Sequence, residues 1–211
     1  MLEYIKIQTV FKRDPDTKYR TLLNGEYSLP IFDYLKNNEW IFTEKIDGTN
    51  IRVIFSDGKV SFEGRTNKAQ IPAFLVKKLM ELFTNEKMAT IFPDGEGCLY
   101  GEGYGAKIQK DGGNYIPDGC NFILFDVMIG KWWLNRSAVQ EIANKLEILI
   151  VPIISTGTLA DAIDIVKNGY NSHIGDCKAE GLVMRPAVEM FSRDGRRVIS
   201  KIKYKDFICL T

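Results

Sequence analysis

The chain has 211 residues, of which 45% are hydrophobic and 26% charged, and its formal net charge is +1. These values exclude an intrinsically disordered or collagen-like chain, and a chain this long can bury a core without disulfides or metal ions. Because 28 basic residues balance 27 acidic ones, the overall charge neither indicates nor excludes a nucleic-acid partner.

Apolar runs, cysteines and histidine exclude several further classes. The longest apolar run, 148–154, is too short to span a bilayer, and the first residues are too charged for a signal peptide. The four cysteines form no C-x-x-C pair, and there is a single histidine, His173, which we expect in a loop. Zinc sites and Cys–His catalysis are therefore poorly supported, and we expect a protein of the reducing cytoplasm.

The first half of the chain predicts strands followed by a helix. Residues 40–43 predict a strand that runs into the segment 44–48. Ile51, Val53 and Phe55 alternate before an Asp57–Gly58 turn, after which apolar residues alternate again, so a hairpin is expected. Apolar residues at helical spacing predict a helix over 72–83, with proline in its first turn.

The second half alternates strands and helices. We predict strands over 122–127, 148–154, 180–185 and 198–204, and two helices between them. One helix is expected to begin after Ser137 as N-cap and to end near Leu146. The other is expected over 159–168, capped by Thr158 and ended by Gly169. The predicted fold class is α+β, with antiparallel sheets and helices packed outside.

A lysine at the end of a predicted strand begins an ordered series of short motifs. The sequence Lys45-Ile46-Asp47-Gly48 alone recurs by chance, and a surface lysine beside a turn explains it equally well. Further matches follow downstream in a fixed order. They are Arg65-Thr66, Glu102 within 100–105, Phe125-Asp126, Glu180 at the start of 180–185, and Lys201-Ile202-Lys203.

This ordered set resembles the covalent nucleotidyltransferase superfamily, which includes ATP-dependent DNA ligases, RNA ligases and mRNA capping enzymes. The matches cover residues 44–204. The chain is most similar to RNA ligases of the editing and repair branch, which read K-x-x-G-[ST]-N, as in Lys45 to Asn50 here. DNA ligases and capping enzymes usually have arginine at the position of Asn50, whereas Asp47 also suits a DNA ligase.

The motif residues suit attack of a lysine on a phosphate. A free lysine amine has a pKa near ~10.4, so it must lose its proton to become a nucleophile. Positive neighbours and a metal ion depress such a pKa, and a drop of about three units corresponds to ~4 kcal/mol. Lys201 and Lys203 alternate on a predicted strand and share one face. Alone they would suit a solvated edge strand, but beside the other motifs they suit a phosphate site.

The resemblance implies a role for each candidate residue. Lys45 would take AMP from ATP as a lysyl-AMP phosphoramidate, pass it to a nucleic-acid 5′-phosphate, and a 3′-hydroxyl would then seal the strand. Lys201 and Lys203 would hold the α-phosphate, and Asn50 would assist ligation. The expected nucleotide contacts are Glu44, Ile46, Arg65, Glu102, Phe125, Glu180, Lys201 and Lys203. Glu180 and Glu102 are the expected ligands for Mg²⁺ or Mn²⁺.

Several candidates have equally simple structural interpretations. Phe125 suits a strand in the core as well as an adenine platform, and Phe122 is the alternative platform. The glycines at 101, 103 and 105 lack a following G-K-[ST], so a close backbone approach or a bulge is expected instead of a P-loop. Basic residues between Arg193 and Lys205 suit either a phosphate-binding surface or a solvated hairpin turn.

The sequence as a whole predicts an ATP-dependent polynucleotide ligase, with RNA preferred over DNA as substrate. The expected fold is an ATP-grasp-like nucleotidyltransferase domain over 1–211, with two antiparallel sheets, flanking helices and no C-terminal OB-fold or helical domain. We therefore expect weak unaided end joining and allow for an accessory protein that binds substrate. The alternatives are a DNA nick ligase, a GTP-using capping guanylyltransferase and an inactive nucleic-acid-binding homologue.

Overall fold

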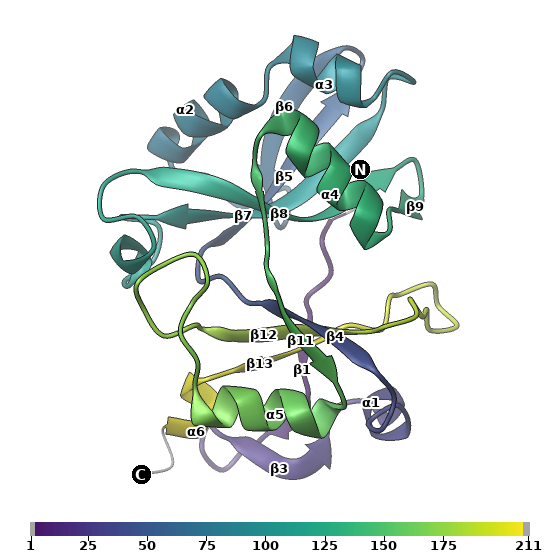
Figure 1. Ribbon diagram of the computed structural model, residues 1–211, viewed down its shortest axis with the longest axis vertical. Coiled ribbons are helices and arrows are strands. Elements are labelled where there is room, and N and C mark those ends of the chain that lie inside the picture. The colour runs from purple at the N-terminus through teal and green to yellow at the C-terminus, as the bar shows by residue number, and fades with distance from the viewer. Residues whose placement is uncertain (1–2, 209–211) are drawn as a thin grey trace. The chain divides into compact units, whose positions relative to one another are not determined.

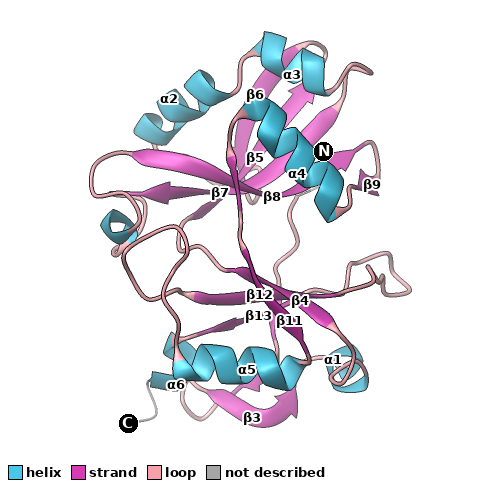
Figure 2. Cartoon of the chain, viewed as in Figure 1, coloured by secondary structure: helices cyan, strands magenta, loops and turns pink. Residues whose placement is uncertain are grey.

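The computed structural model describes residues 3–208, which divide into two compact units (Figures 1 and 2). Unit 1 combines the residues up to Ile5 with Asp47–Val151, and unit 2 combines Lys6–Ile46 with the residues from Pro152 onward. Each unit has its own sheet and its own buried apolar core. Whether the two units act as one nucleotidyltransferase domain stays a prediction.

Unit 1 is built on a six-stranded sheet in the order β10-β8-β7-β5-β6, with β9 paired to β8. All of its pairs are antiparallel except β10 with β8. The strands are β5 (Thr49–Ser56), β6 (Lys59–Gly64), β7 (Gly97–Gly105), β8 (Cys120–Ile129), β9 (Trp132–Trp133) and β10 (Leu149–Ile150). The helices are α2 (Ala73–Leu82), α3 (Asn85–Ile91) and α4 (Arg136–Leu146), with a 3₁₀ turn, η1 (Gly112–Asn114).

The predicted hairpin of unit 1 is confirmed. Asp57 and Gly58 connect β5 to β6 with positive φ angles of 52° and 71°, which is the backbone that a tight two-residue hairpin needs. Ile51, Val53 and Phe55 point to one face, where Leu75 and Leu79 of α2 join the same core. The helix predicted over 72–83 is confirmed too, with Pro72 directly before its first residue.

Unit 2 contains a five-stranded sheet in the order β1-β13-β12-β4-β11, and a separate hairpin of β2 and β3. Only the edge pair β1 with β13 is parallel in the larger sheet. The strands are β1 (Gln8–Thr9), β2 (Phe11–Arg13), β3 (Leu22–Tyr27), β4 (Trp40–Glu44), β11 (Ile153–Gly157), β12 (Gly181–Pro186) and β13 (Ser200–Lys203). The helices are α1 (Pro30–Tyr34), α5 (Leu159–Asn168) and α6 (Lys205–Ile208).

The two helices predicted in the second half exist, but one cap was wrong. Thr158 caps α5 and forms a reciprocal capping box with Asp161, and Gly169 ends the helix as predicted. In α4 the cap is Asn135, not Ser137: the Asn135 Oδ1 accepts from the Ala138 N–H at 3.0 Å, and the Ser137 hydroxyl donates to that same oxygen. Asn135 therefore serves as the N-cap of α4, and Ser137 lies in the first turn of the helix.

The single strand predicted over 148–154 is wrong. The segment forms two short strands in different sheets, β10 in unit 1 and β11 in unit 2. The break falls at Val151–Pro152. The Val151 N–H donates to Leu124 of the first sheet, whereas the Pro152 carbonyl accepts from Glu44 of the second. Proline has no N–H for a ladder, so the apolar run changes sheet at that point.

The mixture of sheets and outer helices confirms the α+β prediction. Among residues 3–208, no helix combines the length and apolar character that crossing a membrane requires. Cys98, Cys120 and Cys177 are free thiols, and Cys209 lies outside the described residues.

Candidate active site

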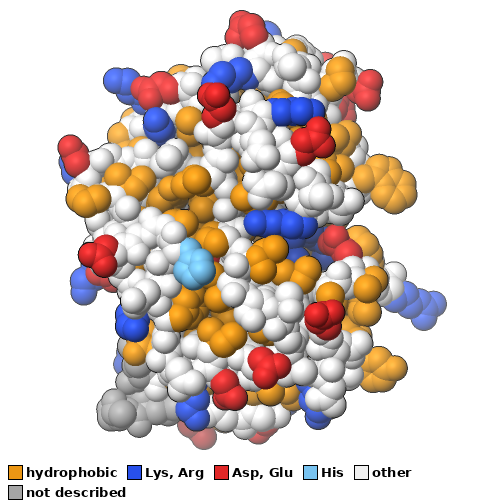
Figure 3. Space-filling view, viewed as in Figure 1, with side chains coloured by type: hydrophobic (Ala, Val, Ile, Leu, Met, Phe, Trp, Pro, Cys, Tyr) orange, Lys and Arg blue, Asp and Glu red, His pale blue; other side chains and the backbone are white. Residues whose placement is uncertain are grey.

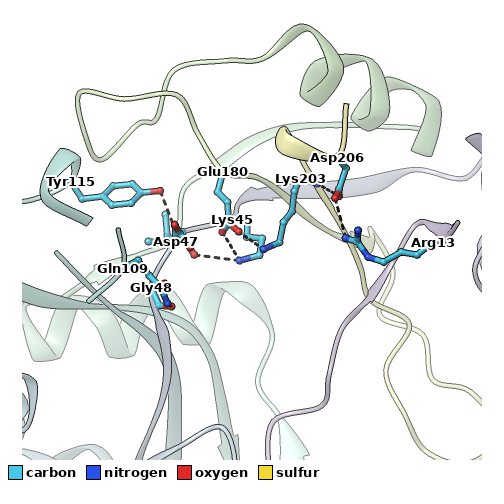
Figure 4. A network of polar contacts seen from close by, with 10 residues as sticks. Arg13, Lys45, Asp47, Gly48, Gln109, Tyr115, Glu180, Lys203 and Asp206 are labelled. Carbon is cyan, nitrogen blue, oxygen red and sulfur yellow. Dashed lines mark hydrogen bonds and ion pairs between the residues drawn. The ribbon is translucent and has the colours of Figure 1, made fainter. Parts of the chain in front are cut away.

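Lys45 follows the last residue of β4 and is held at both its backbone and its side chain. Its N–H donates to the Gly181 carbonyl at 2.9 Å, which extends the β4–β12 pairing by one residue. Its Nζ donates to the Glu180 Oε2 at 2.6 Å, and the two side chains are only 19% and 10% exposed. The residue predicted as nucleophile is therefore a positioned, largely buried ammonium (Figure 4).

Glu180 lies between two predicted site lysines. Its Oε1 accepts from the Lys203 Nζ at 2.5 Å, while Oε2 accepts from Lys45. Burial raises the pKa of the Glu180 carboxyl, but the charges and hydrogen bonds of Lys45 and Lys203 outweigh burial, so its pKa is lowered overall. Glu180 is thus an ionised group that holds two lysines together.

Lys201 belongs to the same cluster through charge. It lies two residues before Lys203 on β13 and faces the same side of the sheet. Burial lowers the pKa of Lys201 to about 8, with further lowering by Lys45 and Lys203 and opposition from Glu180. An amine with this pKa exchanges its proton within the range in which most enzymes work.

The depressed pKa of Lys201 gives a direct prediction. In NMR titrations of lysine side chains, the Lys201 resonance should titrate with a midpoint near 8. Exposed lysines should titrate near ~10.4. The Lys201→Arg variant identifies the resonance by its loss. Titration of every lysine above about 10 would contradict the described electrostatics.

Glu44 is a buried carboxylate whose partners were missed by sequence reasoning. It is 1% exposed; its Oε1 accepts from the Ser172 hydroxyl at 2.5 Å and its Oε2 from the His173 N–H at 2.9 Å. Glu44 therefore anchors the loop that precedes Glu180. Ile46, the other predicted neighbour of adenine, is 3% exposed. His173 lies in this loop, as predicted; its side chain is exposed and is the pale blue residue in Figure 3.

The turn after Lys45 is fixed within unit 1. The Tyr115 hydroxyl accepts from the Asp47 N–H at 3.2 Å, and the Gln109 side-chain amide donates to the Gly48 carbonyl at 2.9 Å (Figure 4). A Cβ on Gly48 would lie 2.7 Å from the Glu102 Cγ and closer still to the Gly103 carbonyl. The glycine of the first motif is therefore required by the close approach of β7.

Replacing Gly48 should be costly for this reason. We expect Gly48→Ala to destabilise unit 1 by about 2 kcal/mol, the usual cost of overpacking against backbone. Gly113→Ala is the matched control, because a Cβ there would have no neighbour within 4 Å. Urea unfolding of both variants measures the difference. Equal stability of the two variants would contradict the close approach.

Asn50 and Glu102 are directly opposite each other on β5 and β7. Residues in register across an antiparallel pair project to the same face of the sheet, so these two predicted site residues are brought together. The Asn50 Oδ1 is buried and has no hydrogen-bond partner. A buried amide oxygen without a partner is costly, and a catalytic role is one of the reasons for which a protein keeps such a group.

Phe125 sits at a β-bulge in β8. Tyr100 pairs with Asp126 and Gly101 pairs with Leu124, so Phe125 has no residue opposite it on β7. A bulge redirects the side chain, and Phe125 is half-buried, with its ring 5.0 Å from that of Tyr4.

Phe122, the alternative platform, is in the core. It is fully buried and packs edge-on against Phe83 at 5.2 Å. A Cβ on Gly101 would clash with the Phe122 ring, and one on Gly103 with Leu75, which confirms the interpretation of these glycines as sites of close approach. Only Phe125 remains available as a partly accessible aromatic surface on this strand.

Arg65 is exposed and follows directly after β6. The backbone around it is held by Arg52, a buried arginine that the sequence analysis did not single out. Arg52 is 1% exposed, and its guanidinium donates to the Gly64 carbonyl and the Asn67 Oδ1, both at 2.8 Å. It also pairs with Glu63 at 2.6 Å. The sequence signal that could have indicated this buried arginine is a basic residue within the apolar alternation of β5.

Two of the basic residues between Arg193 and Lys205 are engaged in ion pairs with neighbouring carboxylates. Arg197 is 7% exposed and pairs with Glu189 at 3.2 Å, and Arg196 pairs with Asp194 in the turn. On the face in Figure 3, basic and acidic side chains are interspersed. The interpretation as a hairpin turn with its own ion pairs therefore fits these two arginines.

The predicted metal ligands, Glu180 and Glu102, would suit a divalent cation that also binds the phosphates of the substrate. In residues 3–208, no cluster of three or more His, Cys, Asp or Glu side chains is suited to hold a metal. Glu180 supplies one ionised carboxylate in unit 2, and Glu102 lies in unit 1. Mg²⁺ is commonly held by one or two carboxylates together with waters and substrate phosphates, and Glu180 suits that mode.

Comparisons with known proteins agree on one family. The family model described as RNA ligase matches residues 38–203, most of the chain. Among curated protein sequences, none matches significantly.

Solved structures of an RNA ligase from Naegleria gruberi share the fold. One, of a variant with ATP and Mn, has a TM-score of 0.66 at 20% identity and covers 96% of this chain and 56% of that one. A second, with PPi, has a TM-score of 0.65 at 20% identity and covers 96% and 57%. A third, of another variant with ATP and Mn, has a TM-score of 0.63 at 23% identity and covers 84% and 54%. The chain thus spans little more than half the length of these structures.

Proposed function

Because the chain belongs to the RNA ligase family, we propose that it is an ATP-dependent polynucleotide ligase that seals RNA 5′-phosphate and 3′-hydroxyl ends. The observation that carries the proposal is the Lys45 amine, 2.6 Å from the ionised Glu180 and among the site lysines. This arrangement suits a nucleophile that attacks a phosphate. Structures of the Naegleria RNA ligase with ATP and Mn support the same nucleotide and a divalent cation here.

In the first step, Lys45 Nζ attacks the α-phosphorus of ATP. A P–N bond forms, the bond to the β-phosphate oxygen breaks, and pyrophosphate leaves. The ion pair with Glu180 stabilises the ammonium form, so Lys45 must release its proton to solvent and leave Glu180 before its amine attacks. A divalent cation held by Glu180, when bound, supplies positive charge that neutralises the phosphates and favours the free amine.

Lys201 and Lys203 hold the α-phosphate during this step. Positive groups that are already positioned stabilise the charge that develops on the phosphate without reorganisation. Lys203 is fixed by Glu180, and Lys201 shares its face of β13. The two lysines thus raise the positive potential around the nucleophile as well as binding the substrate.

The AMP then moves from Lys45 to the 5′-phosphate of RNA, which forms a pyrophosphate linkage and frees the lysine. The 3′-hydroxyl attacks the adenylylated 5′-phosphate, a phosphodiester forms, and AMP leaves. We assign Asn50 to these later steps. Phe125 is assigned to adenine stacking, with Arg65 and Glu102 at the ribose or the acceptor phosphate.

Labelling with nucleotide tests the proposal. The chain is incubated with Mg²⁺ and α-labelled ATP or GTP and separated on a denaturing gel. We expect covalent label from ATP, removed again by added pyrophosphate. Absence of label with either nucleotide would overturn the proposal, and label from GTP alone would favour a capping enzyme.

Nicked duplexes decide the substrate class. We expect faster sealing when ribose rather than deoxyribose carries the 3′-hydroxyl. Equal sealing of all-DNA nicks would replace the RNA assignment with a DNA ligase.

A further inference from the structure

Outside the motif residues, an ion pair of Arg13 and Asp206 is connected to the candidate site through the backbone of Lys203. Asp206, at the start of α6, has a side chain only 2% exposed. Its Oδ1 accepts from the Arg13 Nη2 at 3.0 Å, and its Oδ2 accepts from the Lys203 backbone N–H at 3.2 Å (Figure 4). A buried carboxylate is costly unless it is paired and hydrogen-bonded, and these two contacts supply the ion pair and a hydrogen bond.

The Lys203 N–H has no strand partner of its own. Gly181, opposite Lys203, uses its carbonyl on the β4 side, where it accepts from Lys45. In an antiparallel pair this turns the Lys203 N–H away from β12, toward the edge that β1 covers. However, β1 pairs only with Ser200 and Lys201, so it ends before Lys203. The Asp206 carboxylate accepts a hydrogen bond from the Lys203 N–H, which β1 is too short to pair with.

A series of contacts between side chains of alternating charge therefore connects Lys45 to Arg13 on β2, and all of its residues belong to unit 2. Lys45 pairs with Glu180, and Glu180 with Lys203; Asp206 binds the Lys203 backbone and pairs with Arg13. Arg13 also lies near enough to lower the pKa of Lys201. Neither Arg13 nor Asp206 lies within the residues that match the family model, 38–203.

We propose that Arg13 and Asp206 are positioning residues that fix the end of β13, and with it the Lys201 and Lys203 side chains, for the first step of the reaction. The proposal rests on the proposed function. Asp206 sets the position of Lys203 through the Lys203 backbone N–H, and the ion pair with Arg13 holds the Asp206 carboxylate in place. Since side chains two apart on a strand move together with its backbone, a shift at Lys203 also moves Lys201.

Four variants separate the two contacts. Asp206→Ala removes both contacts, whereas Asp206→Asn keeps an acceptor for the Lys203 N–H but loses the negative charge. Arg13→Gln removes the positive charge that pairs with Asp206, and Arg13→Lys retains it. Lys12→Gln is the matched control, because Lys12 is on the same strand and pairs with Glu26 at the surface. All are compared at equal folded fraction by circular dichroism.

The main measurement is single-turnover labelling with ATP. We expect Asp206→Ala to lower the maximal rate by about 10- to 100-fold while the ATP concentration for half-maximal rate changes little, as for a misplaced reacting group. Asp206→Asn and Arg13→Gln should lie between Asp206→Ala and the wild type, and Arg13→Lys should restore most of the rate. Wild-type rates in all four variants would overturn the proposal.

A second measurement distinguishes positioning from general destabilisation. Lys201 is faced by Lys45, Lys203, Glu180 and Arg13, and its pKa is about 8. Asp206→Asn leaves Arg13 uncompensated and should lower that pKa further, whereas Arg13→Gln should raise it. Loss of structure alone would raise it in both variants, toward that of a free lysine, which would also overturn the proposal.

The two levels of proposal fail differently. If the wild type takes no label from any nucleotide, the proposed function fails, and the Lys201 titrations alone decide the Arg13–Asp206 contact. If the wild type is labelled and the variants are labelled equally fast, the proposed function stands and the positioning role is overturned.

Discussion

Lys45→Ala should abolish covalent labelling by α-labelled ATP. The variant lacks the only atom that is proposed to bond to the α-phosphorus, so labelling should fall below the detection limit of the assay. Lys45→Arg should be equally inactive, because a guanidinium keeps its proton throughout the working pH range. Labelling on a denaturing gel measures both variants.

Two controls make this result specific. Lys167→Ala removes an exposed lysine of α5 in the same unit and should be labelled like the wild type. Sealing of RNA that is already adenylylated at its 5′ end bypasses the first step, so Lys45→Ala should retain measurable sealing there. Label that persists in Lys45→Ala would show that another residue is the nucleophile.

Local patterns were sufficient to predict much of the scaffold. The Asp57–Gly58 hairpin and the Thr158-capped helix depend on turn and cap chemistry within a few residues, and both are present. The run over 148–154 failed because apolar character does not say which sheet a residue joins, and Pro152 moved the chain to another sheet.

The site was predicted as a set of residues but not as a set of contacts. The motif order predicted Lys45 and Glu180 as site residues, yet their ion pair joins residues 135 positions apart, and no local signal gives such a pairing. The burial of Glu44 against Ser172 is equally non-local. The bulge at Phe125 is a register property of two strands, which periodicity within one strand does not contain.

Arg13 and Asp206 escaped the sequence analysis for a related reason. Neither belongs to a motif, and each resembles an ordinary surface charge when read alone. Their importance becomes visible only when β1 ends before Lys203 and leaves a backbone N–H for Asp206 to accept. Short edge strands adjoining a site are therefore a good place to look for positioning residues.

Glu180→Gln should have the second largest effect. The substitution preserves shape but leaves Lys45 and Lys203 facing each other without the carboxylate that accepts from both. Removing one partner of a buried ion pair leaves uncompensated charge, and we expect a loss of about 3 kcal/mol in the stability of unit 2. Labelling by ATP should fall by at least about 100-fold, as for loss of a group that organises transition-state charge.

The pH dependence of this loss has a definite sign. The pKa of Glu180 in the folded protein is lowered from 4.5, so its contribution to stability is present above pH 4.5 and is lost as the pH falls through the folded value. The wild type should therefore lose its advantage over Glu180→Gln on acidification below pH 4.5. Urea unfolding followed by the fluorescence of Trp40, which is fully buried in unit 2, measures this in a background with Trp132 and Trp133 replaced by Phe.

A surface pair and a second substitution separate the buried charge from general effects. Glu26→Gln removes a carboxylate whose partner, Lys12, is 56% exposed, and should cost less than about 1 kcal/mol. Adding Lys203→Met to Glu180→Gln removes one of the two uncompensated ammonium groups and should recover part of the stability. If Glu180→Gln cost no more than Glu26→Gln, the Glu180 carboxylate would not be the group that holds the two lysines. If the double variant were less stable than the single one, repulsion between Lys45 and Lys203 would not be the cause of the loss.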